Sequence, residues 1–433
     1  MILLQNGTVI DPESGFEKKA DILIKGAEIA AIGQNLISDI DKKSLEIIDC
    51  SDKIIGPGLV DVHVHFRDPG FTYKEDIDSG SEAAKKGGYT SVVLMANTKP
   101  PVDTPQTIQY ILDKGKKTGI NVYTCATITK KMVGQQLNDF KLLKEAGAIG
   151  FTDDGIPLLT ENIVKQAMNE AAMEDVVLSF HEEDPSFIEN NGINHGKASE
   201  YFKIGGSNRQ AEISMVQRDI ALAMETGAKV NFQHISSKET VDLIRQAKKT
   251  EKGSQIYAEA TPHHIALTED AAIKYQTLGK MNPPLREEAD RQAIIKGLLD
   301  NTIDMIATDH APHSKEEKAK PITEAPSGIL GLETAFSVAY HTLVEENAMP
   351  LIQLLDKMSY APAKLYGLNA GGVKINGPAD LCIIDTKCKW KIEKFASKSQ
   401  NSPFLNQELS GKVIMTICKG QIVYNNEQQD KKQ

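Results

Sequence analysis

The sequence predicts an α/β protein: a (β/α)8 barrel of the TIM type, with a small β-sandwich domain formed by the N- and C-terminal segments. Apolar, strand-like runs recur eight times between residues 58 and 310, and helical patterns separate most of them. Shorter strand-like runs flank this region at both ends of the chain. Alternating strands and helices indicate a parallel sheet, and eight repeats is the number that closes a barrel. An open doubly wound sheet alternates in the same way, but no GxGxxG motif follows an early strand.

The two ends of the chain predict the smaller domain. Short strand-like runs are separated by Asn-Gly, Asp-Pro and Gly turns, and they cover residues 1–10, 20–33, 45–50, 379–387 and 412–425. Because these runs lie on either side of the barrel in sequence, we expect them to pair with each other. The expected domains are a composite β domain of residues 1–52 plus 370–433 and a barrel of residues 53–369.

The central region supplies the barrel elements in order. The predicted strands cover residues 58–66, 89–97, 120–128, 147–154, 176–183, 229–236, 255–262 and 302–310. Among the segments between them, apolar residues at helical spacing predict helices over 77–88, 107–119, 162–175 and 238–250.

Composition excludes several classes of function. The net charge is -10 and no long Lys/Arg block occurs, which argues against a nucleic-acid partner. No run of about 18 apolar residues is present, so we expect no membrane span. The five cysteines are scattered without a CxxC pair, which is typical of a reduced protein of the cytoplasm.

Histidines and aspartates gather where the predicted strands end. The first strand carries His63 and His65, whose side chains point to one face because side chains alternate along a strand. Later strands end at Asp153-Asp154, His181, His234 and Asp309-His310. The carboxyl ends of barrel strands meet on one face, so these groups should converge. Four histidines and two carboxylates suffice for two divalent ions with one carboxylate bridging, and this N/O ligand set suits zinc.

The remaining histidines have other expected roles. His263 and His264 follow the seventh strand, where packing or loop hydrogen bonding explains them better than a metal. His310 should face away from its neighbour Asp309, because side chains alternate. His313 lies on the loop over the barrel mouth, where we expect it to contact a substrate.

Six motifs give the chain a family resemblance over nearly its whole length: DVHVHFRDPG, MANTKPPVD, FTDDG, KMNPPLR, ATDHAPH and GLETA. Together they resemble the dihydroorotases with a full-length barrel and a flanking β domain, within the amidohydrolase superfamily. The resemblance implies reversible hydrolysis of (S)-dihydroorotate to N-carbamoyl-L-aspartate by a zinc-bound hydroxide. This is a step of de novo pyrimidine (UMP) biosynthesis.

The resemblance also implies roles for single residues. It places one zinc ion on His63, His65 and Asp309, a second on His181 and His234, and Asp154 between them. Asp154 lies 27 residues before His181, the separation that the family's bridging Asp shows. Asp309 would also be the catalytic proton carrier. The substrate-binding positions match His65, Arg67, Asn97, Asn282, His313, Ser327 and Gly328, and some relatives carry an aromatic residue in place of Ser327.

Two alternatives stay open beside this interpretation. Another cyclic amidase, such as a hydantoinase or allantoinase, would share the barrel; hydantoinase-like relatives bridge their metals with a carboxylated lysine, which FTDDG lacks. A non-catalytic dihydroorotase-like scaffold should have lost metal ligands. We expect a small-molecule substrate, no nucleic-acid or membrane partner, a homodimer, and an association with aspartate transcarbamoylase as a further option.

Overall fold

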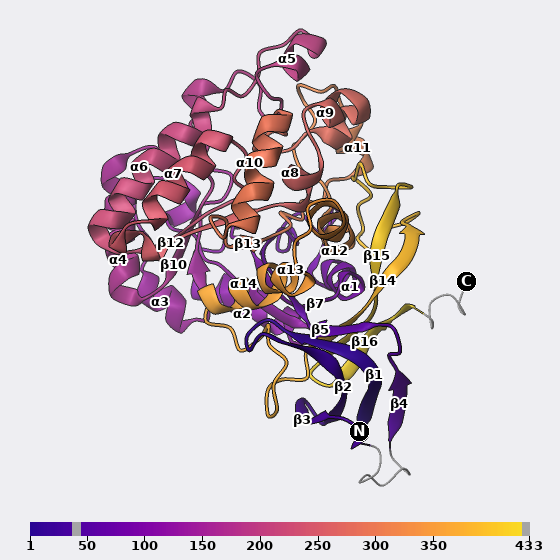
Figure 1. The fold of residues 1–433 in the computed structure, drawn as a ribbon. Coiled ribbons are helices and arrows are strands. Elements are labelled where there is room, and N and C mark those ends of the chain that lie inside the picture. Colours follow the sequence, from indigo (N-terminus) through magenta and orange to yellow (C-terminus); the bar gives the residue numbers. More distant parts are fainter. Residues whose placement is uncertain (37–44, 427–433) are drawn as a thin grey trace.

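The computed structural model describes residues 1–36 and 45–426 and contains a closed barrel of eight parallel strands (Figure 1). The strands are β6 (Leu59–Val64), β7 (Tyr89–Leu94), β8 (Asn121–Thr124), β9 (Gly150–Phe151), β10 (Val177–Phe180), β11 (Lys229–Phe232), β12 (Ile256–Ala260) and β13 (Met305–Ile306). Each lies inside one of the eight predicted runs. They form one sheet of β6 to β8 and another of β9 to β13. The parallel bridges Ala126–Phe151 and Val64–His310 join the two sheets, which confirms the predicted barrel.

Helices surround the barrel and connect its strands (Figure 1). They are α1 (Ile77–Gly87), α2 (Pro105–Gly115), α3 (Phe140–Glu145), α4 (Glu161–Glu174), α5 (Lys197–Phe202), α6 (Gln210–Thr226), α7 (Lys238–Lys248), α8 (Pro262–Ala266), α9 (Asp270–Tyr275), α10 (Glu288–Leu299), α11 (Lys315–Lys318), α12 (Ala335–Ala339), α13 (Leu351–Leu355) and α14 (Ala361–Leu365). Helix α1 shows why the chain folds this way locally. Asp76 caps its first turn by accepting the N–H of Ser79, and Gly88 ends it at a φ of 92°.

The two ends of the chain meet in a second sheet, where indigo and yellow strands lie together in Figure 1. Its strands are β1 (Ile2–Asp11), β2 (Phe16–Lys25), β3 (Glu28–Gly33), β4 (Glu46–Asp49), β5 (Ile54–Pro57), β14 (Leu381–Lys391), β15 (Glu408–Cys418) and β16 (Gln421–Asn425). Strand β1 pairs with β2 along one edge and with β4 and β5 along the other. Strand β5 also pairs with β14, so the sheet is continuous from one end of the chain to the other. The β domain built from both termini is therefore confirmed, while its exact boundaries stay a prediction.

Each part has an apolar core of its own. Residues such as Ile22, Ile55 and Ile383 form a cluster inside the β domain, and a larger cluster lies between the barrel strands and their helices. Burial on this scale stabilises the frame from which the strand ends project. In the described part of the chain, no helix is both long and apolar enough to cross a membrane.

Candidate metal centre and active site

Six side chains from five different barrel strands converge at the carboxyl end of the barrel. His63 belongs to β6, and His65, Asp154, His181, His234 and Asp309 each stand one to three residues beyond the end of a strand. All six are buried, with exposed fractions of 7% or less. Their convergence follows from the barrel itself, since parallel strands bring their carboxyl ends to one face.

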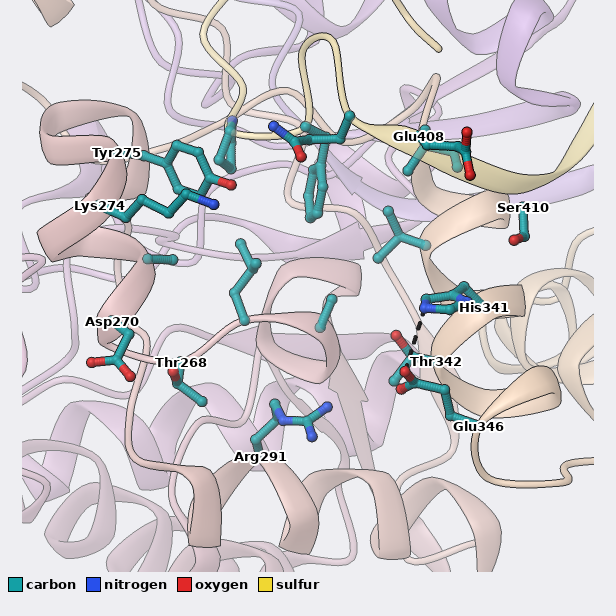
Figure 2. Close-up of a pocket in the computed structure, with 18 of the residues that line it drawn as sticks. Thr268, Asp270, Lys274, Tyr275, Arg291, His341, Thr342, Glu346, Glu408 and Ser410 are labelled. Carbon is teal, nitrogen blue, oxygen red and sulfur yellow. Dashed lines mark ion pairs between the residues drawn. The ribbon is translucent and has the colours of Figure 1, made fainter. Parts of the chain in front are cut away.

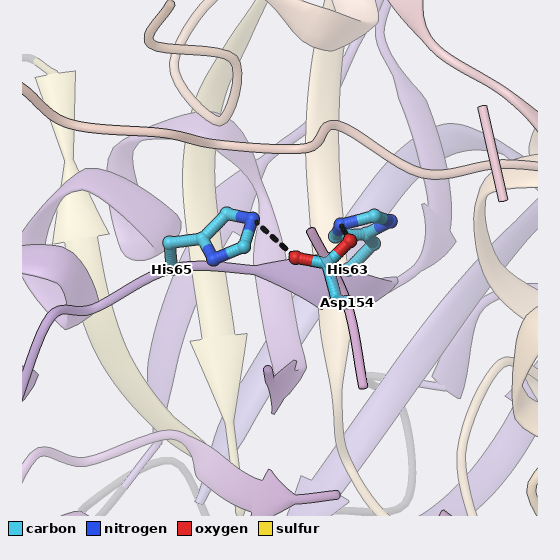
Figure 3. A group of neighbouring side chains, drawn as sticks. All are labelled: His63, His65 and Asp154. Carbon is cyan, nitrogen blue, oxygen red and sulfur yellow. Dashed lines mark ion pairs between the residues drawn. The ribbon is translucent and has the colours of Figure 1, made fainter. Parts of the chain in front are cut away.

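Asp154 lies at the centre of this group. Its Oδ1 atom is 3.5 Å from Nε2 of His63, 3.6 Å from Nδ1 of His181 and 4.0 Å from Nε2 of His234. Its Oδ2 atom is 3.5 Å from Nε2 of His65. Figure 3 shows the carboxylate between the rings of His63 and His65. One carboxylate thus faces a nitrogen of all four histidines, which is the arrangement that a bridging ligand requires.

The other carboxylate, Asp309, lies against the first two histidines. Its Oδ1 is 2.9 Å from Nε2 of His65 and 3.5 Å from Nε2 of His63. On the opposite side, Nδ1 of His181 is 3.0 Å from Nε2 of His234. Three overlapping groups result in which the ligand atoms lie within 4.8 Å of one another: His63, His65 and Asp154; His63, His234 and Asp309; Asp154, His181 and His234.

The donor set fits a divalent cation. Nε2 of His63 is buried and, among the described residues, has no hydrogen-bond partner, although it faces two carboxylates. A buried nitrogen without a hydrogen-bond partner lowers the stability of the fold unless a ligand such as a metal ion binds it. Imidazole nitrogens and carboxylate oxygens held this close are ligands that zinc accepts.

The pKa shifts in the cluster also indicate that it favours a positive charge. Burial alone would lower the pKa of His181, but the nearby carboxylates of Asp154 and Glu183 raise it to about 10. Burial would raise the pKa of Asp154, but the charge on His63 and the neighbouring ring of His181 hold it well below its usual range. Asp154 therefore stays ionised and attracts positive charge into the cluster.

Three residues at this site have strained backbones. Arg67, His234 and Asp309 have φ values of 59°, 31° and 47°, in the left-handed region that side-chain-bearing residues rarely adopt. Such conformations are held in place by the surrounding structure and gather at functional sites.

Four predicted substrate-binding residues lie together on one side of the cluster. Arg67 donates from Nε to the carbonyl of Pro312 at 3.2 Å, and its Nη2 lies 3.4 Å from Nε2 of His313. The same nitrogen of His313 lies 2.8 Å from the carbonyl oxygen of Ser327. Gly328 follows at a φ of 125°, where an added Cβ would lie 2.7 Å from the Cβ of Ala311. The contact of these residues with a substrate stays a prediction.

The two predicted asparagines contact metal-ligand candidates. Asn97 donates to Oδ2 of Asp154 at 2.9 Å, and its Oδ1 lies 3.0 Å from Nδ1 of His65. Asn282 approaches Nε2 of His181 at 3.4 Å, and its buried Oδ1 has no hydrogen-bond partner among the described residues. Asn97 thus holds two candidate ligands in place, a role that sequence analysis did not foresee.

Two glutamates that contact metal-ligand candidates were not predicted from the sequence. Glu259 lies 2.6 Å from Nδ1 of His63, and Glu183 lies 3.0 Å from Nε2 of His181. A charged residue inside the apolar run of β12 was the available signal for Glu259, because a buried charge needs a partner.

The neighbouring side chains follow the expected pattern. His264 lies in α8, where its Nδ1 is 2.8 Å from Oγ1 of the capping residue Thr261 and its Nε2 is 3.1 Å from the carbonyl oxygen of Pro283. Nδ1 of His310 accepts the N–H of Gly331, so its ring is directed away from Asp309. Asp153 accepts the N–H of Ile128 at 2.8 Å and supports the backbone beside the cluster.

A separate cavity of about 630 Å³ opens between α9, α10 and the helix that follows α12 (Figure 2). It contains none of the six clustered side chains. Charged groups on its wall pair with each other: Arg291 with Glu288 at 2.7 Å and His341 with Glu346 at 3.4 Å. This cavity is therefore not the site to which the strand ends point.

Comparison with known proteins agrees with this geometry. The sequence profile of the amidohydrolase family matches residues 54–423. A dihydroorotase of Clostridioides difficile (strain 630) is 51% identical, with 98% of this chain and 100% of that protein covered. A dihydroorotase of Clostridium acetobutylicum is 49% identical, with 98% and 99% covered. Among solved structures, an L-hydantoinase (dihydropyrimidinase) from Arthrobacter aurescens superposes with a TM-score of 0.85 at 25% identity, covering 98% of this chain and 96% of that one. The chain belongs to the amidohydrolase family and, within it, to the dihydroorotases.

Proposed function

We propose that this chain interconverts (S)-dihydroorotate and N-carbamoyl-L-aspartate at the site around Asp154, with two zinc ions. One observation carries the proposal. A complete set of six ligand candidates surrounds one buried carboxylate, in a chain 51% identical over its length to a dihydroorotase. A non-catalytic scaffold would have no reason to keep all six.

The ligands divide into two groups that share Asp154. His63, His65 and Asp309 would hold one ion, and His181 and His234 would hold the other. Divalent cations in such a site act as Lewis acids: they lower the pKa of a water molecule to about 7 and polarise a carbonyl oxygen.

Asp309 is the proposed proton carrier. Its Oδ1 lies 2.9 Å from His65 and its side chain is buried at the barrel mouth. A carboxylate there can accept the proton of the attacking water and pass it to the ring nitrogen as the amide bond breaks. Ring closure uses the same steps in reverse.

Arg67 is the proposed anchor for the substrate carboxylate. It stands two residues beyond His65, and a guanidinium can hold a carboxylate with two parallel hydrogen bonds. His313, Ser327 and Gly328 lie on the same side and would complete the pocket. Asn97 and Asn282, which contact the ligand candidates Asp154 and His181, would bind the substrate from the side of the metal site.

A second candidate is a hydantoinase-type cyclic amidase, because solved hydantoinases share the fold. The proposed role of Arg67 argues against this candidate, since hydantoin and dihydrouracil carry no carboxylate for a guanidinium to bind. Turnover of dihydroorotate should exceed turnover of dihydrouracil and hydantoin under the same conditions. Faster turnover of either uncharged ring would reverse the assignment.

We also propose that the protein works in the cytoplasm as a homodimer, and that its only required partner is the small-molecule substrate. The five scattered cysteines without a CxxC pair support the cytoplasmic location. Sedimentation of the purified chain, alone and with aspartate transcarbamoylase, tests the dimer and the optional association.

A further inference from the structure

Glu259 is a buried carboxylate of β12 that lies beneath the proposed metal site. Its Oε1 atom is 2.6 Å from Nδ1 of His63, and both side chains are fully buried. We propose that Glu259 is a positioning residue, which fixes the tautomer and the orientation of His63 so that Nε2 faces the metal. This inference rests on the proposed metal site and names a residue outside its ligand set.

The chemistry of the contact gives the tautomer. A carboxylate only accepts hydrogen bonds, so the Nδ1 atom it contacts must carry the proton. In the neutral ring, the form that binds a metal, Nε2 then presents its lone pair. That nitrogen is 3.5 Å from an oxygen of Asp154 and 3.5 Å from an oxygen of Asp309, and it has no hydrogen-bond partner among the described residues. The ring therefore offers its free nitrogen to the centre of the cluster.

The position of Glu259 is itself fixed from the neighbouring strands. Its Oε2 accepts a hydrogen bond from Nδ2 of Asn231 on β11 at 2.9 Å. Asn231 also reaches Oγ of Ser179 on β10 at 2.9 Å. A chain of contacts thus runs across four strands and ends at His63 on β6. A carboxylate partner also raises the basicity of a metal-bound imidazole, so both the angle and the strength of binding depend on it.

The test replaces Glu259 by glutamine and measures zinc affinity on the demetallated protein, by competition with a chromophoric chelator. Glutamine keeps the size of the side chain. The glutamine NH2 group can find an acceptor in this position. Oδ1 of Asn231 has no hydrogen-bond partner among the described residues, and the Asn231 amide can rotate to turn this oxygen toward the glutamine. The glutamine oxygen can still accept from His63, but the negative charge is gone, so Glu259→Gln should raise the zinc dissociation constant about 10- to 100-fold, the usual effect of mutating such a partner.

Asp290→Asn is the matched control. Asp290 is equally buried and accepts hydrogen bonds from Arg209 at 3.0 Å, away from the six clustered side chains. It should lower thermal stability and leave zinc affinity within about twofold of the original chain, the scatter we allow for a residue without ligand contact. Asn231→Ala is a second probe, because it loosens Glu259 without touching His63, and it should weaken zinc binding in the same direction.

The decisive comparison repeats Glu259→Gln in a His63→Ala background. If Glu259 acts through His63, then Glu259→Gln should add little to the loss of zinc affinity that His63→Ala has already caused. Equal losses in both backgrounds, or unchanged zinc affinity in both Glu259→Gln and Asn231→Ala, would overturn the inference. Failure of the unaltered chain to bind zinc would instead refute the proposed metal site, so the two failures are distinguishable.

Discussion

Replacing Asp154 by asparagine removes the one anion that faces all four histidines while keeping the shape of the side chain. Its oxygens lie 3.5 to 4.0 Å from those ring nitrogens, in a site with about a twentieth of the side chain exposed. Removing one partner of a buried charge pair costs about 3–5 kcal/mol. At about 1.4 kcal/mol for each factor of ten, the zinc dissociation constant should rise roughly between 10²-fold and 4 × 10³-fold.

The assay measures bound zinc per chain and turnover of dihydroorotate on the same samples. The variant should lose at least one equivalent of zinc and nearly all activity. The original chain, once demetallated, should recover its full activity when zinc is added back in buffer free of carbon dioxide. Asp154 is an anion at neutral pH without modification, because an aspartate has an unperturbed pKa of about 3.9 and cations lower it further.

Asp153→Asn is the control for this experiment. Asp153 accepts the N–H groups of Ile128 and Thr129, so its loss should cost about 1–3 kcal/mol of stability. It should nevertheless keep the zinc content of the original chain. Unchanged zinc content in Asp154→Asn, or a strict need for bicarbonate during reconstitution, would show that another group bridges the ions.

Three further outcomes are expected. Arg67→Met should keep its zinc but lower kcat/KM for dihydroorotate about 10- to 10²-fold, because a charge-assisted contact contributes about 1.5–3 kcal/mol; near-normal turnover would refute its role as carboxylate anchor. Asp309→Asn should fold and retain much of its metal, yet keep less than about a tenth of the activity, since an amide cannot carry the proton at neutral pH; a higher rate would show that neither proton transfer by Asp309 nor its negative charge is required. Chelation of the metals should lower Tm, because a ligand at about 1,000 times its Kd stabilises the native state by about 4 kcal/mol; an unchanged Tm in calorimetry would contradict a metal centre inside the folded chain.

The barrel strands could be predicted because they are buried on both faces. Runs such as the one that forms β7 carry no charged residue and are buried along their whole length, and turn residues separate them from helices of regular period. The six clustered side chains were predictable for a related reason. A polar residue at the end of such a run has a definite place in a closed barrel, whatever its distance along the chain.

The groups that support the ligands could not be predicted in the same way. Glu259 lies 196 residues from His63, and nothing in the sequence between them encodes their pairing. Asn97 was expected at the substrate, but the structure also shows it between His65 and Asp154. Such contacts depend on how the strands are staggered and on side-chain rotamers, which the apolar pattern does not specify.

The bridge between Val64 and His310 is the place where the last strand of the barrel meets the first. His65 and Asp309 flank this seam and are 244 residues apart in sequence. A metal ion that binds both acts as a cross-link over almost the entire barrel. By the logarithmic rule for loop closure, tying such distant points together removes about 5 kcal/mol of chain entropy from the unfolded state. Only a chain that has folded all eight repeats can form this cross-link, so metal binding would follow closure of the barrel. Once bound, the metal would stabilise the closed barrel against unfolding.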